Sequence, residues 1–322
     1  MFHPRILLLL WLAVAPGALA LPTRDVPVDE QYVLGPDSQV QPGVPTGTIQ
    51  EFTLPDTKAY PGFARKWWLY LPAGYDSKRE LPFMVWLDGG RFHDRDGAWR
   101  VPVVLDNLIA KKQLPAMAAI FIDPGDHPQK LGRKPDKRPD GRNVPPANRS
   151  VEYDTPSAAF AAFLEAEIIP VAEKLARLTA DPTGRGIGGS SSGGICAFTA
   201  AWFRPDLFSK VFTGNGSFTN IRGGHIYPGL VRAEAVRPLR IFQQDGRRDN
   251  PDAAAGSWTE ANQALAAALD EKQYDHQFVL GEGTHNPRHG ASVLPYALRW
   301  LWRDYPLGSP GNQPTANQLS LP

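Results

Sequence analysis

The stretch "RGIGGSSSGGICAF", from Arg185 to Phe198, places three consecutive serines between two pairs of glycines. A nucleophile elbow has the pattern G-x-S-x-G, in which a serine sits on a sharp turn between a strand and a helix. Of the three serines, only Ser191 has glycine both two positions before it, at Gly189, and two positions after it, at Gly193. The pattern therefore makes Ser191 the candidate nucleophile.

The residues around the motif have the context that an elbow requires. The segment 184–187 is a short candidate strand, and the segment 193–202 ("GGICAFTAAW") is apolar enough for a buried helix. Glycine suits the turn because it tolerates unusual backbone dihedrals and close packing. The backbone N–H of Ser192 would then point toward the carbonyl under attack, as half of an oxyanion hole. The competing interpretation is a glycine- and serine-rich loop without a catalytic role.

Short apolar runs and helical patterns alternate along the chain on both sides of the elbow. This alternation is typical of βαβ units. We therefore expect an α/β-hydrolase fold, with a mostly parallel central sheet that begins with antiparallel strands and is flanked by helices on both faces. Pro170 is expected to kink or split the longest helix. The predicted strands are residues 47–54, 66–71, 83–87, 118–122, 184–187, 211–213, 239–243 and 277–280, and the predicted helices are residues 103–112, 157–178, 193–202, 258–270 and 291–302.

A nucleophilic serine needs a base and an acid that orients the base. In this fold the three residues follow one another in the order Ser, Asp or Glu, His. The predicted strand 239–243 leads into "DGRRDN", which offers Asp245 and Asp249 in the loop where the acid belongs. We favour Asp249, because Asp245 lies in an Asp-Gly pair, a common turn whose carboxylate often caps its own backbone. Asp245 is the alternative.

Four histidines that follow Ser191 are candidates for the base. His225 precedes the acid and His276 precedes the last predicted strand, so neither has the place of a triad base. The segment "GEGTHNPRHG" follows that strand and puts His285 before the final helix. We expect the imidazole of His285 to take the serine proton and return it to the leaving group, with His289 as the alternative.

Two further segments are expected near the reaction site. The predicted strand 83–87 ends in "DGGR", and two glycines let a backbone approach the reacting carbonyl closely. The N–H of Gly90 is the expected second oxyanion donor, with Gly89 as the alternative and a simple turn as the competing interpretation. The basic, proline-rich insertion 124–150 either borders a substrate cleft or is a solvated surface loop.

Taken together, these motifs resemble the putative-esterase family, which includes enterochelin esterases, feruloyl and acetyl-xylan esterases, S-formylglutathione hydrolases and mycolyltransferases. The resemblance rests on "LPFMVWLDGGRF", "NRSVEYD", "GGSSSGGICAF", "FQQDGRRDN" and "GEGTHNPRHG", and it extends over residues 47–305. It implies Ser191 as nucleophile, Asp249 as acid and His285 as base. It also implies Gly90 and Ser192 as the oxyanion donors.

The resemblance also suggests a role for the residues beside Gly90. Formylglutathione hydrolases carry histidine before the glycine of the oxyanion loop, whereas this chain has Asp88, as enterochelin esterases and mycolyltransferases do. In mycolyltransferases the matching Asp and Arg help to bind sugar, so the resemblance implies Asp88 and Arg91 as candidate substrate contacts. A local salt bridge that shapes the loop is the competing interpretation.

The two ends of the chain have compositions that differ from the middle. Residues 1–20 combine a short basic start, the apolar run "ILLLLWLAVA" and a final "ALA", which is typical of a secretory signal peptide. We expect residues 21–46 to be an N-terminal extension or a strap on the domain, residues 47–305 to form the esterase domain, and residues 306–322 to be a flexible tail. The mature protein is accordingly expected to be secreted or periplasmic, without a membrane-spanning segment.

These features favour an exported serine esterase that forms and hydrolyses an acyl-enzyme. Its substrate would be a small-molecule or carbohydrate ester, a hydroxycinnamate ester or a siderophore lactone. A net charge of +1 gives no reason to expect a nucleic-acid partner. The chain has no H-E-x-x-H motif, and we predict no metal and no cofactor. The alternatives are an acyltransferase with a sugar acceptor and a non-catalytic binding protein of the same fold.

Overall fold

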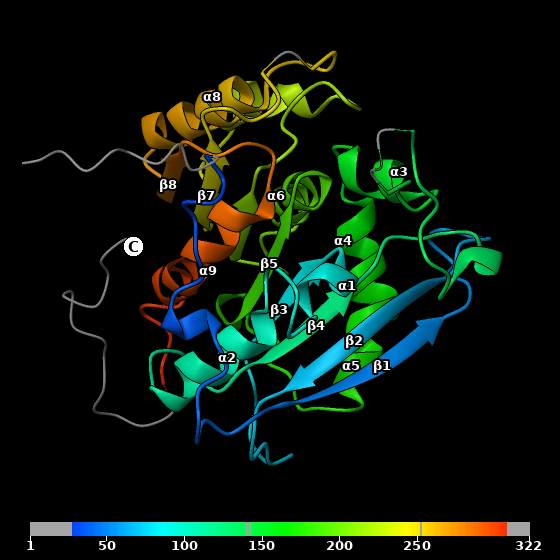
Figure 1. Ribbon diagram of the computed structural model, residues 1–322, viewed down its shortest axis with the longest axis vertical. Coiled ribbons are helices and arrows are strands. Elements are labelled where there is room, and N and C mark those ends of the chain that lie inside the picture. Colours follow the sequence, from blue (N-terminus) through cyan, green and yellow to red (C-terminus); the bar gives the residue numbers. More distant parts are fainter. Residues whose placement is uncertain (1–27, 140, 142, 252, 308–322) are drawn as a thin grey trace, which may run out of the picture.

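The computed structural model describes residues 28–139, 141, 143–251 and 253–307. The predicted signal peptide, and the predicted tail beyond residue 307, lie outside the described residues. Within these residues, eight strands form one sheet in the order β1-β2-β4-β3-β5-β6-β7-β8 (Figure 1). The strands are β1 (Thr48–Leu54), β2 (Arg65–Leu71), β3 (Phe83–Leu87), β4 (Ala118–Ile122), β5 (Arg185–Ser190), β6 (Lys210–Gly214), β7 (Arg240–Gly246) and β8 (Asp275–Gly281).

The sheet is mostly parallel, as predicted. From β4 to β8 in the sheet order, every neighbouring pair of strands is parallel. Among the eight strands of this sheet, only β2 runs in the opposite direction to the others, since it is antiparallel to both β1 and β4. Every predicted strand is present. β5 continues beyond residue 187 to Ser190, because β6 pairs with it as far as Gly214.

Helices cover both faces of the sheet, which also agrees with the prediction (Figure 1). Side chains alternate between the two faces of a strand, so that in β2 Trp67 and Leu69 enter one core while Trp68 and Tyr70 enter the other. The first core contains residues of α3 to α8, and the second contains residues of α1, α2 and α9. The helices are α1 (Gly89–Phe92), α2 (Val101–Ala110), α3 (Arg149–Asp154), α4 (Ala159–Phe163), α5 (Ile169–Glu173), α6 (Ser192–Phe203), α7 (Tyr227–Ala233), α8 (Trp258–Glu271) and α9 (Pro287–Leu301).

The helix predicted over residues 157–178 is split and ends early. It consists of α4, a π-helical segment (Leu164–Ile168) and α5, which ends at Glu173. Pro170 has no N–H and its ring crowds the carbonyl four residues earlier, so the regular hydrogen-bond pattern cannot continue through it. The π-helical turn before Pro170 accommodates this interruption. Among the described helices, none is both long and apolar enough to cross a lipid bilayer.

Residues 28–46, called the strap from here on, lie against the domain. The side-chain amide of Asn107 in α2 donates hydrogen bonds to the backbone carbonyls of Asp37 and Gln39 at 2.9 and 2.8 Å. The carboxylate of Asp37 accepts from Lys111, which follows α2, and from Arg299 in α9. Figure 1 shows the strap as a blue segment that passes α9 and α2. These contacts join the N-terminal part of the described chain to two helices of the second core.

Candidate active site

The elbow predicted around Ser191 is present at the junction of β5 and α6. Ser191 has φ 59° and ψ −125°, a backbone conformation that non-glycine residues rarely adopt. Its own N–H donates to the carbonyl of Gly214 at the end of β6, at 2.9 Å. A Cβ atom at Gly189 would lie 2.5 Å from the carbonyl carbon and oxygen of Gly193, so the strand and the helix approach too closely for a side chain there. Strand–helix packing therefore requires glycine at the first position of the motif.

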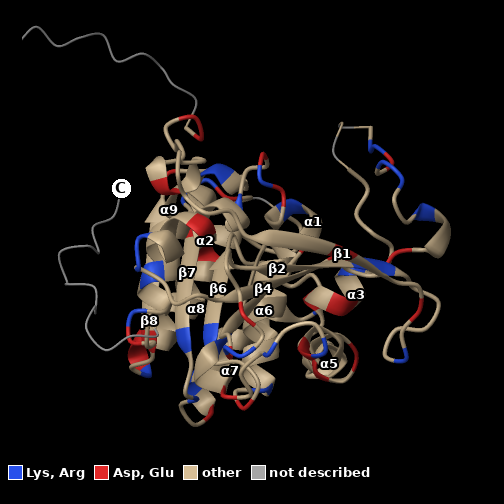
Figure 2. Cartoon of the chain, turned by 90° about the horizontal axis from the view of Figure 1, so that it is seen from below, with Lys and Arg blue, Asp and Glu red and all other residues tan. Residues whose placement is uncertain are grey.

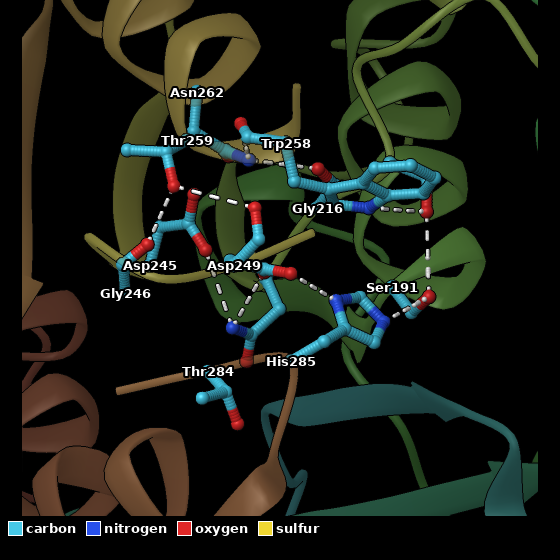
Figure 3. A network of polar contacts seen from close by, with 12 residues as sticks. Ser191, Gly216, Asp245, Gly246, Asp249, Trp258, Thr259, Asn262, Thr284 and His285 are labelled. Carbon is cyan, nitrogen blue, oxygen red and sulfur yellow. Dashed lines mark hydrogen bonds and ion pairs between the residues drawn. The ribbon is translucent and has the colours of Figure 1, made fainter. Parts of the chain in front are cut away.

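A chain of hydrogen bonds connects Ser191, His285 and Asp249 (Figure 3). The three residues follow β5, β8 and β7, whose carboxyl ends meet at one edge of the parallel sheet. His285 Nε2 lies 2.9 Å from Ser191 Oγ, and His285 Nδ1 lies 2.7 Å from Asp249 Oδ1. The Asp249 side chain is fully buried, whereas that of His285 is 29% exposed. The hydroxyl therefore has a base within proton-transfer distance, and the base is open to the cleft.

The alternative acid, Asp245, lies beside Asp249 but does not orient the imidazole. The side-chain amide of Asn215 donates to Asp249 Oδ2 at 2.9 Å and to Asp245 Oδ1 at 3.2 Å, so that it bridges the two carboxyl groups. Both acids are fully buried. Burial, together with the neighbouring Asp249, raises the pKa of Asp245 to about 9. Asp245 therefore holds its proton at neutral pH, and Asp249 is the acid that contacts His285.

The alternative base, His289, has a different hydrogen-bond partner. It lies in α9 and is only 4% exposed. Its Nδ1 is 2.9 Å from Nε2 of Gln244, a residue of β7. Burial lowers the pKa of His289 to about 4. Among the described histidines, His285 is the one with a ring nitrogen at hydrogen-bond distance from Ser191 Oγ.

The two predicted oxyanion donors have different surroundings. Ser192 is the first residue of α6, where backbone N–H groups have no acceptor within the helix. The N–H of Gly90, in contrast, donates to Asp123 Oδ1 at 2.8 Å. Burial raises the pKa of Asp123 to about 6. Sequence reasoning did not identify Asp123, which follows β4 and faces the oxyanion loop from a neighbouring strand.

Asp88 forms a salt bridge, which was the alternative to a role in substrate binding. Its partner is Arg149 rather than Arg91. Arg149 Nε and Nη2 donate to the two carboxylate oxygens of Asp88 at 2.8 and 2.6 Å. Burial alone would raise the pKa of Asp88, but the charge and hydrogen bonds of Arg149 outweigh burial, and the pKa is lowered. Arg91 is exposed, and both Asp88 and Arg91 line the cleft beside Ser191.

Ser191 and His285 open into a cleft with a volume of about 950 Å³. The basic insertion forms one of its walls, through residues 135, 137, 138, 141 and 143–146, so the insertion borders the cleft rather than lying apart from it. Figure 2 shows Lys and Arg in blue along this part of the chain. The rings of Phe92 and Trp99 lie next to the cleft but are buried in the second core. Among the described residues, no group of three or more His, Cys, Asp or Glu is placed to hold a metal ion.

Two side chains next to the triad were missed by sequence reasoning. The hydroxyl oxygen of Ser217 lies 3.3 Å from Ser191 Oγ, and the indole N–H of Trp258 donates to Ser217 at 3.1 Å. The Trp258 ring meets the His285 ring edge to face, with 5.7 Å between centroids (Figure 3). The turn residues "GNGS" after β6 were the only local signal for this region.

A mostly parallel sheet covered on both faces, with a serine elbow, an acid and a histidine after β5, β7 and β8, defines an α/β-hydrolase. This class contains many families that differ in substrate. The model of one of them, described as putative esterase, matches residues 59–289, and the chain belongs to this family.

The similar proteins include esterases of two kinds. The chain is 27% identical over 318 residues to the iron(III) enterobactin esterase of Dickeya dadantii (strain 3937), covering 90% of this chain and 66% of that protein. An enterobactin esterase structure from Shigella flexneri has a TM-score of 0.62 and 24% identity, over 83% of this chain and 61% of that one. A ferulic acid esterase structure from the anaerobic fungus Anaeromyces mucronatus has a TM-score of 0.60 and 18% identity, over 82% and 92% of the two chains. The chain thus spans somewhat less than two thirds of the enterobactin esterases it matches.

Proposed function

We propose that the protein is a serine esterase that works through an acyl-enzyme. The observation that carries this proposal is the continuous hydrogen-bond chain from Ser191 Oγ to His285 at 2.9 Å and from His285 to the buried Asp249 at 2.7 Å. A hydroxyl is a weak nucleophile unless an adjacent base removes its proton during attack. The elbow holds the hydroxyl at the open end of this chain, where an ester can reach it.

In the proposed reaction, Ser191 Oγ attacks the carbonyl carbon of the ester while His285 Nε2 takes the hydroxyl proton. The bond between the carbonyl carbon and the alcohol oxygen then breaks, and His285 returns the proton to that oxygen. Water attacks the acyl-enzyme in the second half and gives a proton to His285, which passes it back to Ser191 as the carboxylic acid leaves. Asp249 keeps Nε2 directed at Ser191 and stabilises the imidazolium that forms twice.

The oxyanion that forms during both attacks needs N–H donors. We propose Ser192 as the first donor, because its N–H lies at the free N-terminal turn of α6 next to the nucleophile. We keep Gly90 as the second donor, which requires its N–H to leave Asp123 when the oxyanion develops. Loss of one such donor typically lowers kcat by roughly 100- to 1,000-fold.

For the substrate, we propose an ester with an aromatic or anionic acyl group, such as a siderophore lactone or a hydroxycinnamate ester. The cleft is lined by the cations of Arg91, Lys137 and Arg138, with the rings of Phe92 and Trp99 buried next to it. Such cations attract anionic groups, and the attraction weakens as salt is added. The relatives named for enterobactin and ferulic acid are consistent with this chemistry. We also propose that the enzyme is exported, on the basis of the signal-peptide pattern in residues 1–20.

The proposal is tested by an ester panel on the purified protein, with aryl acetates, methyl ferulate, acetylated xylan and a catecholate trilactone as substrates. Ser191→Ala should abolish turnover while the circular dichroism spectrum stays unchanged. His285→Ala should lower kcat by about 10⁴-fold or more, and His289→Ala by about tenfold or less, because His289 does not reach the hydroxyl. Turnover that survives in Ser191→Ala would exclude the mechanism. Transfer of the acyl group to an added sugar in preference to water would identify an acyltransferase instead.

A further inference from the structure

The loop between β8 and α9 carries His285 and is held from two sides. On one side it meets the loop that carries Asp249. The N–H of Arg247 donates to the carbonyl of Gly281 at 2.8 Å, and the N–H of Arg248 donates to the carbonyl of Gly283 at 3.0 Å. These backbone bonds fix the distance between the loop of the acid and the loop of the base.

On its other side, the same loop is held by the strap. Asp29 Oδ1 accepts the N–H of Thr284 at 2.9 Å, and Asp29 Oδ2 accepts the hydroxyl of the same residue. The phenol oxygen of Tyr32 accepts the N–H of Glu282 at 2.7 Å. The Tyr32 ring also stacks on His289 at the start of α9, with 4.2 Å between centroids and 22° between planes. The strap therefore binds the residue directly before His285 and the first turn of the helix that follows it.

The glycines of "GEGTH" leave room for these contacts. A Cβ atom at Gly281 would lie 2.3 Å from Cε1 of His289 and 2.4 Å from the phenol oxygen of Tyr32, so a side chain there would displace these rings. At Gly283, a Cβ atom would lie 3.1 Å from Asp29 Oδ1. On the opposite side of the loop, a Cβ atom at Gly246 would lie 2.1 Å from the carbonyl oxygen of Gly283. The loop of the base is thus enclosed by backbone on one side and by strap side chains on the other.

We infer that Asp29 and Tyr32 are positioning residues for His285, so that the strap is a working part of the active site. The inference rests on the proposed function, in which His285 is the base. Thr284 precedes His285, so fixing its N–H and hydroxyl restricts the backbone from which the imidazole projects. Catalysis depends steeply on such placement, since a misplacement of about 1 Å lowers rates by about 100-fold. Without Asp29, the exposed side of the loop would lose both hydrogen bonds to Thr284.

The test compares full-length variants of the strap. Asp29→Ala should lower kcat by about 10- to 100-fold with KM changed by less than about twofold, because the cleft that binds substrate is untouched. Asp29→Asn keeps an oxygen for the Thr284 N–H and should restore most of kcat. Tyr32→Phe removes the acceptor for Glu282 but keeps the ring, and should give a smaller loss. The matched control is Asp37→Ala, which breaks a charged anchor of the strap to Lys111 and Arg299, away from the loop of the base; its kcat and KM should stay within about twofold of the wild type.

A second measurement does not depend on turnover. The proton between His285 Nδ1 and Asp249 should give a downfield NMR resonance, which should exchange with solvent faster in Asp29→Ala than in the wild type and in Asp37→Ala. The inference is overturned if Asp29→Ala leaves both kcat and this resonance unchanged, or if Asp37→Ala lowers kcat as much as Asp29→Ala. If the wild-type protein hydrolysed no ester, the proposed function would be refuted instead. The NMR resonance alone would then test whether the strap positions His285.

Discussion

Replacing Arg65 with methionine is expected to destabilise the protein strongly, because Arg65 forms a two-point contact with a fully buried carboxylate. Arg65 Nη1 and Nη2 donate to the two oxygens of Glu152 at 2.7 and 3.0 Å, and neither side chain has exposed surface. Glu152 Oε1 also accepts the N–H of Gly125 at 3.1 Å and the side-chain amide of Asn148 at 2.7 Å. One carboxylate thus joins β2 and α3 to both ends of the insertion that walls the cleft.

The magnitude follows from what remains around Glu152 in the variant. Removing one partner of a buried ion pair typically costs about 3–5 kcal/mol, because the other charge stays buried without compensation. The two uncharged donors at Gly125 and Asn148 remain, so we expect the lower end, a decrease of about 3 kcal/mol in the free energy of unfolding. For a domain of this size, that corresponds to a decrease in Tm of about 6–12 °C.

Urea denaturation of Arg65→Met and of a matched control measures this loss. The control is Arg232→Met, which breaks another two-point contact, between Arg232 and Glu271, with distances of 2.6 and 2.9 Å. Those side chains are 43% and 54% exposed, so solvent screens the pair and its loss should destabilise the protein far less than the loss of Arg65. The double variant Arg65→Met/Glu152→Met should recover most of the stability, because it leaves no charge buried. If Arg65→Met were no less stable than Arg232→Met, the reasoning about burial would be refuted.

Two substitutions near the triad give further predictions. In the folded protein the pKa of Asp245 is raised to about 9, whereas an Asp side chain in the unfolded chain loses its proton near pH 4. Asp245 therefore lowers the free energy of unfolding increasingly as the pH rises from about 4 to about 9. Asp245→Asn should therefore raise the free energy of unfolding at pH 8, with the gain shrinking as pH falls toward 4; equal denaturation curves at pH 8 would contradict the assignment. Gly189→Ala places a methyl group 2.5 Å from the backbone of Gly193 and should destabilise by about 1–3 kcal/mol and lower kcat by about 100-fold. Gly229→Ala in α7, where a Cβ would meet nothing within 4 Å, should leave kcat unchanged when both variants are assayed on the same ester.

The sheet was predictable from the sequence because each of its strands has a recognisable local sequence pattern. Strands of a parallel sheet are buried on both faces, and they appear as short apolar runs such as "FMVWL" and "AAIFI". Short helices have weaker signals. α7 spans seven residues and buries only Tyr227 and Val231, which is too little for a periodic pattern, and α3 has six residues. These two elements were missed for that reason.

The three residues of the proposed triad could be picked out from the sequence because each of them lies in a local motif at the end of a strand. The residues that support it do not share this property. Asn215 contacts Asp249 across 34 positions of the chain, and Arg149 contacts Asp88 across 61. No spacing rule connects residues that meet only through the order of strands in the sheet. The contact between Asp29 and Thr284, across 255 positions, lies still further beyond local patterns.

The wall of the cleft that the insertion forms comes from a different stretch of chain than the residues proposed to carry the reaction. Ser191, Asp249 and His285 follow β5, β7 and β8, whereas the insertion follows β4. A change of length or sequence within residues 135–146 would therefore alter this wall while leaving Ser191, Asp249 and His285 in place. A replaceable wall segment offers a physical reason why one fold can accept different esters, as the names of the enterobactin and ferulic acid esterases that share this fold suggest.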